Sequence, residues 1–370
     1  MSGLKTPTLT PNIPRIGHKF RDAADICQAA VMKIAPGASR LHWIDALRGV
    51  AIILVIFLHA SLALKYYSDA YPRSLRGINL LLEPFRMPLL VFLAGYFVTR
   101  SLRKGAVRYF TGKIRHVVWP YLIWSFVGLF ALGTITPKTA LRVLYDPVET
   151  HLWYLWFLPA YYFLAWALKR VPAWIPGMIA LIASHWMPED IRLEKFVFLF
   201  AFFMFGVYFS TRQEAIESII ERRPVVITAA LLAVATGLVN LSSLKVLYEP
   251  LYAPGLFGSI IVAVWLFRRI PPNPVSTALE FVGRNSLIYY VSHLVPIHLT
   301  GFLMRDIGYS AHWPLFAVFL TVGFGTGTAF ALLSARFAAV RILFEAPPFT
   351  SPPARAARQI PAPAEPAARR

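Results

Sequence analysis

The sequence predicts an all-α, polytopic integral membrane protein with about ten transmembrane helices and both termini in the cytoplasm. Hydrophobic residues make up 57% of the 370 residues and charged residues only 15%, whereas about 25% are charged in an ordinary soluble domain. The apolar residues also gather in runs of about 18 residues or more, which is the length that a helix needs to cross a bilayer. Finally, the connections between the apolar runs are alternately rich and poor in lysine and arginine. Membrane proteins show this pattern because their cytoplasmic loops carry the excess of basic residues.

The apolar runs predict ten spans. We place them near residues 44–64, 79–99, 117–136, 152–168, 172–188, 195–211, 224–241, 251–267, 285–304 and 312–335. The fifth run is short, and Pro172, Pro176 and Pro188 lie in it. A kinked or re-entrant element is therefore the alternative to a full span at that point, provided that protein covers its backbone.

Three regions follow from composition. Residues 1–40 carry Pro7, Pro11, Pro14 and six basic residues, which predicts a cytoplasmic arm and no cleavable signal peptide. Residues 41–345 form the transmembrane domain. The segment 346–370 is rich in proline, alanine and arginine, and we expect it to be disordered.

Basic residues set the orientation. The formal net charge is +19, but the cations are dispersed between apolar runs, so we expect no nucleic-acid partner. With the N-terminus inside, the segments assigned to the cytoplasm carry 26 lysines and arginines and the external loops carry nine. That asymmetry favours cytoplasmic termini. Cys27 is the single cysteine, which excludes an intramolecular disulfide and a cysteine-based zinc site, and we expect no metal.

The first helix carries charges within the bilayer, where each is costly and often functional. Arg48 and His59 are eleven residues apart, so they share a helix face and lie about 16 Å apart along the axis. Asp45 lies one turn before Arg48 and can hold its guanidinium. The alternative is that Arg48 reaches the interface and His59 is a buried packing histidine.

The second and fourth helices add further polar groups toward the outer side. Glu83 and Arg86 are three residues apart and can pair, either as part of a site or as an ordinary interfacial ion pair. His151 and Trp153 open the fourth helix. An aromatic belt at the interface explains the tryptophan, but aromatic faces also suit sugar rings, and the belt does not explain the histidine.

The ninth helix and one basic segment complete the candidates. Ser286 and His293 are seven residues apart and share a face, as site residues or as polar contacts between helices. The predicted cytoplasmic loop 100–116 contains a dense set of cations, among them Arg100, Arg103 and Arg115. Orientation alone accounts for such a loop, although guanidinium groups would also clamp a polyphosphate.

These residues resemble the acyltransferase family 3 membrane proteins, over roughly residues 41–335 and in the family's order. Arg48 and His59 match the family's Arg-x10-His signature in the first helix. The other matching motifs are the run Phe85–Phe97, in which Ala94 replaces the usual serine, the basic segment ending at Tyr121, the run beginning at His151, and the run Ser286–His293. The Phe-Arg-Met-Pro version of the second motif most resembles the glucan-biosynthesis protein C branch, whose members succinylate periplasmic glucans.

The resemblance implies an inner-membrane enzyme that takes an acyl group from cytoplasmic acyl-CoA, acetyl-CoA or succinyl-CoA, and transfers it to a hydroxyl of an extracytoplasmic glycan. Under this hypothesis the CoA-binding residues are Asp45, Arg48, Arg100, Arg103 and Arg115. His59 is the general base, and His293, His151 or Ser286 donates to the developing oxyanion. The acceptor would contact the following residues: Glu83, Arg86, His151 and Trp153.

Two other classes remain open from the residues alone. A transporter also lines its path with buried Arg, His and Glu, although we find no internal repeat of the kind common in transporters. A membrane scaffold would use the same polar residues only for packing. Beyond membrane lipid, acyl-CoA and a glycan, the sequence indicates no partner, and it does not define the oligomeric state.

Overall fold

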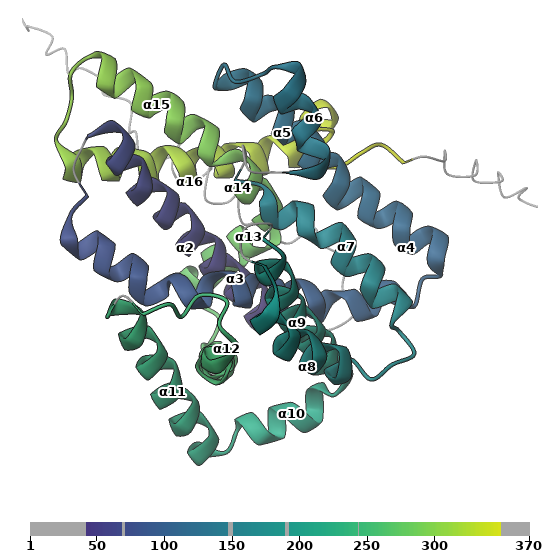
Figure 1. Ribbon diagram of the computed structural model, residues 1–370. Coiled ribbons are helices and arrows are strands. Elements are labelled where there is room, and N and C mark those ends of the chain that lie inside the picture. Colours follow the sequence, from purple (N-terminus) through teal and green to yellow (C-terminus); the bar gives the residue numbers. More distant parts are fainter. Residues whose placement is uncertain (1–41, 69–70, 147–150, 189–191, 243, 349–370) are drawn as a thin grey trace, which may run out of the picture. The chain divides into compact units, whose positions relative to one another are not determined.

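The computed structural model describes residues 42–68, 71–146, 151–188, 192–242 and 244–348, and within these ranges all regular structure is helical (Figure 1). The predicted N-terminal arm lies outside the described residues, as does the predicted tail from residue 349 onward. The elements are α2 (His42–Tyr67), α3 (Arg73–Leu102), α4 (Ala106–Lys113), η1 (Ile114–Val118), α5 (Trp119–Ala131), α6 (Pro137–Tyr145), α7 (Trp153–Ala167), α8 (Trp174–Ala183), η3 (Ser184–Trp186), α9 (Leu193–Thr211), α10 (Gln213–Ile220), α11 (Arg223–Leu241), η4 (Pro250–Tyr252), α12 (Ala253–Phe267), α13 (Pro274–Arg284), α14 (Ser286–Ser292), α15 (Leu294–Asp306), α16 (His312–Arg336) and α17 (Ala338–Arg341).

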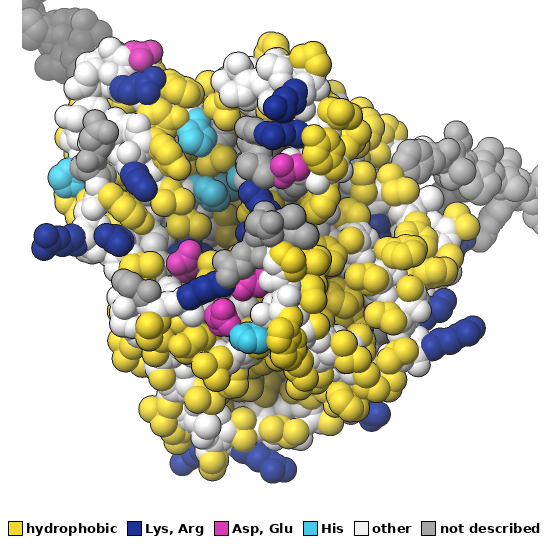
Figure 2. Space-filling view, in the orientation of Figure 1, with side chains coloured by type: hydrophobic (Ala, Val, Ile, Leu, Met, Phe, Trp, Pro, Cys, Tyr) yellow, Lys and Arg dark blue, Asp and Glu magenta, His cyan; other side chains and the backbone are white. Residues whose placement is uncertain are grey.

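Eight helical stretches are long and apolar enough to cross a membrane, which confirms the predicted class of an all-α, polytopic membrane protein. Hydrophobic side chains also cover most of the face seen in Figure 2. The two other predicted spans correspond to α7, with 15 residues, and α8, with ten. Their rises of about 22 Å and about 15 Å are shorter than a hydrocarbon core of about 30 Å. The number ten and the side of the termini stay predictions.

Helix α2 packs against α3, α13, α15 and α16 (Figure 1). Its closest approach is to α13, where glycine occurs on both sides. A Cβ added at Gly283 would overlap the backbone oxygen of Asp45, and one added at Gly49 would overlap the backbone oxygen of Leu279. The two backbones are thus in direct contact. This contact fixes the position of the polar residues of α2 relative to α13.

Helices α3 and α9 form a second close pair. A Cβ at Gly95 would overlap the backbone oxygen of Phe203, and one at Gly206 would overlap the backbone oxygen of Phe92. Small residues let membrane helices approach in this way. Gly95 and Gly206 therefore permit the close packing of α3 and α9.

The segment 100–116, predicted as a cytoplasmic loop, is mostly helical. Helix α3 continues to Leu102 and α4 begins at Ala106. The connection is short because Gly105 adopts φ 80°, a left-handed conformation that a glycine tolerates and other residues rarely do. Helix α4 then continues without a break through the π-helical turn η1 into α5. The prediction of a loop was wrong because a single glycine turn reverses the chain.

The chain after α17 returns to the turn η1. Arg115 forms an ion pair with Glu345 and donates a 2.9 Å hydrogen bond to the backbone oxygen of Ala346. The indole of Trp124 donates to the backbone oxygen of Leu343 at 3.1 Å. Ala346, the first residue of the predicted disordered tail, is buried. The ordered domain therefore extends at least one residue further than predicted.

Candidate active site

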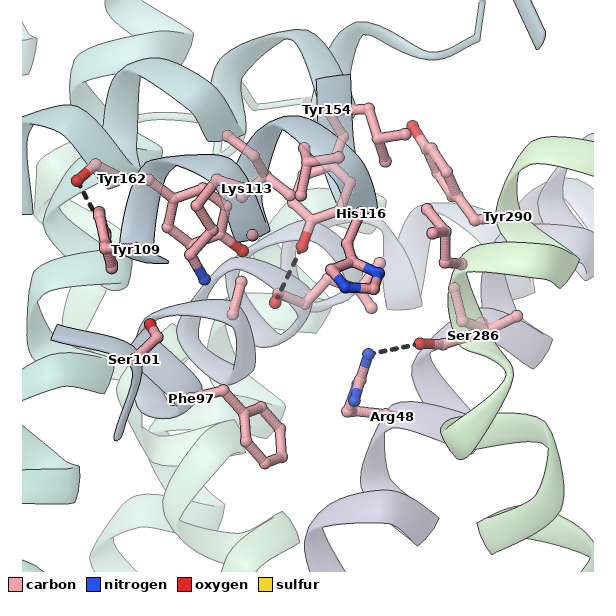
Figure 3. Close-up of a pocket in the computed structure, with 18 of the residues that line it drawn as sticks. Arg48, Phe97, Ser101, Tyr109, Lys113, His116, Tyr154, Tyr162, Ser286 and Tyr290 are labelled. Atoms are coloured by element: carbon pink, nitrogen blue, oxygen red, sulfur yellow. Dashed lines mark hydrogen bonds between the residues drawn. The ribbon is translucent and has the colours of Figure 1, made fainter. Parts of the chain in front are cut away.

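A cavity of about 430 Å³ lies between α2, α3, α4, η1, α7 and α14 (Figure 3). One wall carries Arg48 and Ser286, and another carries Lys113 and His116; in the close-up the ring of His116 lies over Arg48. The whole lining consists of Arg48, Ile52, Leu90, Ala94, Phe97, Ser101, Lys104, Arg108, Tyr109, Gly112, Lys113, His116, Val117, Tyr154, Leu155, Leu158, Tyr162, Ser286, Leu287 and Tyr290. The described residues of this lining include no carboxylate.

Arg48 is held in place from two sides. Its guanidinium donates a 2.6 Å hydrogen bond to the hydroxyl of Ser286, as Figure 3 shows, and lies 5.1 Å from the ring centre of Phe97. Asp45 is buried one turn earlier on α2. Ser286 thus lies beside Arg48, at the cationic end of the cavity. This position differs from the oxyanion role expected for Ser286 next to the histidines.

The other wall supplies three cations and a histidine of the basic segment 100–116. Lys104, Arg108, Lys113 and His116 all line the cavity. The sequence indicated this segment as a possible polyphosphate clamp, but these four residues were not among the expected donor ligands. The ammonium of Lys113 lies 3.8 Å from the ring centre of Tyr162. The four residues are spaced four, five and three positions apart, and each step is close to one helical turn. A loop, as the sequence predicts for this segment, would give that spacing no meaning.

Three cations named from the sequence lie elsewhere. Arg115 is occupied by Glu345 and Ala346. Arg103 lines a different cavity, formed with α7, α8, α9 and α10. Arg100 is exposed at the end of α3 and is not part of the lining. Of the residues expected to hold the donor's phosphates, the structure brings only Arg48 to this cavity. The basic segment contributes four other residues to the lining: Lys104, Arg108, Lys113 and His116.

Two tyrosines of the lining pack against each other. Tyr154 and Tyr290 both line the cavity, and their ring centres are 5.5 Å apart. The hydroxyl of Tyr290 donates a 2.8 Å hydrogen bond to the backbone oxygen of His151. In return, Nε2 of His151 lies 3.2 Å from the backbone oxygen of Tyr290. Since a carbonyl only accepts, that nitrogen carries the proton.

Three histidines from separate parts of the chain meet next to Tyr290. The ring centre of His293 lies 5.1 Å from that of His59 and 5.1 Å from that of His151, and the rings of His59 and His151 are 6.0 Å apart. His59 comes from α2, His151 precedes α7, and His293 separates α14 from α15. His293 is fully buried, whereas the other two are partly exposed. The sequence predicted each histidine separately, and the fold assembles them into one cluster.

The hydrogen bonds of His293 define its orientation. Nδ1 lies 3.0 Å from the backbone oxygen of Tyr289, so Nδ1 carries a proton. Nε2 is buried and has no hydrogen-bond partner among the described residues. A neutral His293 therefore presents an acceptor to the cluster, whereas the sequence analysis expected it to donate to an oxyanion.

A buried polar network lies on α2 and α3 next to this cluster. Arg86 donates to the backbone and side-chain oxygens of Asn79, at 2.6 and 3.1 Å. The amide of Asn79 in turn donates to the hydroxyl of Ser61, two residues after His59. Arg86 is 3% exposed and Glu83 is half-buried. Arg86 therefore forms its hydrogen bonds with Asn79, whereas the sequence predicted that it pairs with Glu83.

Trp153 does not reach the cavity. Its ring packs on Tyr154 and Phe157, and the ammonium of Lys195 lies 3.1 Å from its ring centre. Trp153 is therefore engaged by packing and by a cation, while the next residue, Tyr154, forms part of the lining.

The comparison with protein families decides the assignment. The family described as an acyltransferase domain (Acyl_transf_3) matches residues 41–335, which spans all the cavity and cluster residues named above. This chain belongs to acyltransferase family 3. It is a multi-pass membrane protein and an acyltransferase.

One curated relative of this family 3 acyltransferase is the inner membrane protein YcfT of Escherichia coli strain K12. The two sequences are 21% identical, and the match covers 73% of this chain and 84% of the relative. No solved structure matches the chain. The printed name of YcfT gives a location and no substrate, so the donor and the acceptor of this enzyme must be argued from its own residues.

Proposed function

We propose that the protein transfers an acyl group, acetyl or succinyl, from cytoplasmic acyl-CoA to a hydroxyl of an extracytoplasmic glycan such as a periplasmic glucan. The location of YcfT supports placing it in the inner membrane. The proposal depends on one observation: Tyr290 lines the cation-lined cavity and its ring also contacts two members of the histidine cluster, His151 and His293.

The cationic end of the cavity is the proposed donor site. Arg48, Lys104, Arg108, Lys113 and His116 line it without a carboxylate, which suits the phosphates of coenzyme A. Arg48 offers a guanidinium whose orientation Ser286 fixes. The pantetheine arm would then extend toward the tyrosines, since Arg48 and His59 are about 16 Å apart along α2.

The histidine cluster is the proposed reaction centre. No hydrogen bond joins His59 to another described residue, and its ring is partly exposed, which leaves it accessible to a substrate. His59 takes the proton from the acceptor hydroxyl as the oxygen attacks the thioester carbon. The carbon–sulfur bond then breaks, the proton passes to the leaving thiolate, and the products are the glycan ester and free coenzyme A.

His293 is the proposed positioning residue for this base. Its Nε2 has no hydrogen-bond partner among the described residues, and the ring centre of His59 is 5.1 Å from its own. At that separation aligned rings bring facing nitrogens within reach of a hydrogen bond. His293 would thus accept a hydrogen bond from the His59 imidazolium and stabilise it during the transfer. Contacts of this kind often tighten only when substrate is bound.

The proposal is tested by acyl transfer in membranes that carry the wild type or the His59→Ala variant. Radiolabelled acetyl-CoA and succinyl-CoA serve as donors and β-glucan oligosaccharides as acceptors. General-base catalysis typically contributes about 10²- to 10⁴-fold, so we expect His59→Ala to lower the rate at least 100-fold. His312→Ala is the matched control, because His312 begins α16 outside the cluster, and it should leave the rate unchanged.

Wild-type activity in His59→Ala would exclude His59 as the base. If the wild type moved the glucan across the membrane without acylating it, a transporter would be the better description.

A further inference from the structure

A second cavity, of about 850 Å³, lies apart from the proposed donor site. It is formed by the ends of α3, α7 and α9, the start of α8, and α10. Its lining shares no residue with the first cavity. The lining residues that carry the argument are Arg103, Lys169, Arg170, Arg212, Trp174 and Ile216.

The charges of this cavity are of one sign. Arg103, Lys169, Arg170 and Arg212 are exposed, and the lining includes no aspartate or glutamate. Within the described part of the chain, none of the four forms an ion pair. These cations differ in this respect from their neighbours Arg268 and Arg269, which pair with Glu217 and Glu221. Their charge is thus available to an anionic ligand.

The rest of the lining is mostly apolar. Leucine, isoleucine, valine, alanine, methionine and proline predominate, and the uncharged polar groups are Thr99, Tyr208 and Thr211. Trp174, 47% exposed, opens α8 at this place. Tryptophan is enriched where a membrane protein meets the headgroup region. A cationic rim above an apolar wall fits a ligand with an anionic head and hydrocarbon chains.

The second cavity lies on the side of the membrane that the sequence predicts to be cytoplasmic. All four cations belong to connections that the lysine and arginine distribution assigns to the cytoplasm, at residues 100–116, 169–170 and 212–223. Anionic lipids concentrate in that leaflet, and basic pockets between transmembrane helices on that side bind their headgroups. A soluble coenzyme fits less well, since the apolar wall offers few hydrogen-bonding groups.

We propose that this cavity binds an anionic phospholipid of the cytoplasmic leaflet. The phosphate lies among Arg103, Lys169, Arg170 and Arg212, and the acyl chains lie along the wall that includes Trp174 and Ile216. The proposal is independent of the transfer reaction, because the two cavities use different residues.

The test uses the full-length protein in detergent micelles doped with dioleoylphosphatidylglycerol, cardiolipin or dioleoylphosphatidylcholine. A ligand that binds only the folded state raises the melting temperature by an amount that grows with the logarithm of its concentration relative to its dissociation constant. We expect both anionic lipids to raise it and phosphatidylcholine to have no effect. The variant Arg103→Gln/Arg170→Gln/Arg212→Gln should bind phosphatidylglycerol at least ~10-fold more weakly, since each nearby cation contributes substantially to such binding.

The matched control is Arg222→Gln/Arg223→Gln/Arg336→Gln. It removes three exposed cations of the same predicted side that do not line the cavity, and it should respond as the wild type does. If the first triple variant melts lower than the wild type without lipid, Ala215→Trp replaces it. That variant fills the apolar wall, keeps every cation, and should weaken binding equally.

Three results would overturn the proposal. The first is an equal response to phosphatidylcholine. The second is an unchanged lipid response in both cavity variants. The third is displacement of phosphatidylglycerol by coenzyme A or by inorganic phosphate at the same concentration, since that would make the cavity a site for a soluble anion.

Discussion

At the scale of single residues, the site is defined by what each polar group bonds to. Arg48 bonds to Ser286, whereas Arg115 is taken up by Glu345, although both are arginines near the predicted cytoplasmic side. His293 donates through Nδ1 and leaves Nε2 without a partner. The residue type alone does not tell a site arginine from a structural one. The hydrogen-bond partners do tell them apart.

Replacing Arg48 should weaken donor binding. A hydrogen bond to a charged group contributes about 1.5–3 kcal/mol, so Arg48→Ala should raise the KM for acyl-CoA about 10- to 100-fold and change kcat less. Ser286→Ala should raise it by a smaller factor, because the guanidinium remains but loses one orienting contact. Steady-state kinetics over a range of acyl-CoA concentrations measures both.

The matched control for that experiment is Arg222→Ala, an exposed cation outside both cavities. An Arg48→Ala enzyme with the wild-type KM would remove Arg48 from the donor site.

At the scale of elements, the contact between α2 and α13 sets the geometry of the site. Gly283 meets the backbone of α2 at Asp45, less than one turn from Arg48, and residues 286–292 of α14 follow directly. The bond between Arg48 and Ser286 therefore spans the two elements whose spacing Gly283 fixes. A change in this spacing would move both partners of that hydrogen bond.

Gly283→Ala should destabilise the protein, because its methyl group would overlap the Asp45 backbone. Overpacking of this kind typically costs about 1–3 kcal/mol, which should appear as a lower melting temperature in detergent. Gly77→Ala is the control, since nothing lies within 4 Å of its added Cβ and alanine favours a helix. Equal melting temperatures for Gly283→Ala and the wild type would contradict the close contact.

Local patterns in the sequence predict the elements well and their assembly poorly. Apolar runs predict α2, α3, α9 and α16, because length and hydropathy are properties of one segment. The spacing of Arg48 and His59 follows in the same way from one helix. The meeting of His59 with His151 and His293 does not, because those contacts join residues more than 90 positions apart in the chain. The π-helical turn and the glycine turn at Gly105 also leave no periodic signal.

At the scale of the whole molecule, the basic residues predict the sidedness on which both proposals depend. The donor cavity and the second cavity take their cations mostly from segments assigned to the cytoplasm. Acyl-CoA and the lipid headgroup would therefore approach from one side, while the acceptor would come from the other. Both proposals therefore require that the basic connections face the cytoplasm, and this orientation can be tested directly.

Cysteine labelling tests the orientation. In a Cys27→Ser background, Lys138→Cys in α6 and Arg222→Cys before α11 each introduce one exposed thiol. A membrane-impermeant maleimide added to intact spheroplasts should label the residue 138 variant and spare the residue 222 variant. Inside-out vesicles should give the opposite pattern. Labelling of both from the same side would reject the predicted topology.

The π-helical turn at residues 114–118 has a consequence for how the cavity tolerates change. Such a turn holds one residue more than an α-helical turn, and each helical residue advances the chain by about 100°. Deleting Ile114, whose side chain is 44% exposed, would let the stretch continue as plain α-helix. Because the wider turn already accommodates the extra residue, the orientation of α4 relative to α5 would change little. A one-residue deletion at this turn should therefore leave Arg108 facing the cavity, whereas a deletion within regular α-helix would rotate the residues before it by about a quarter turn.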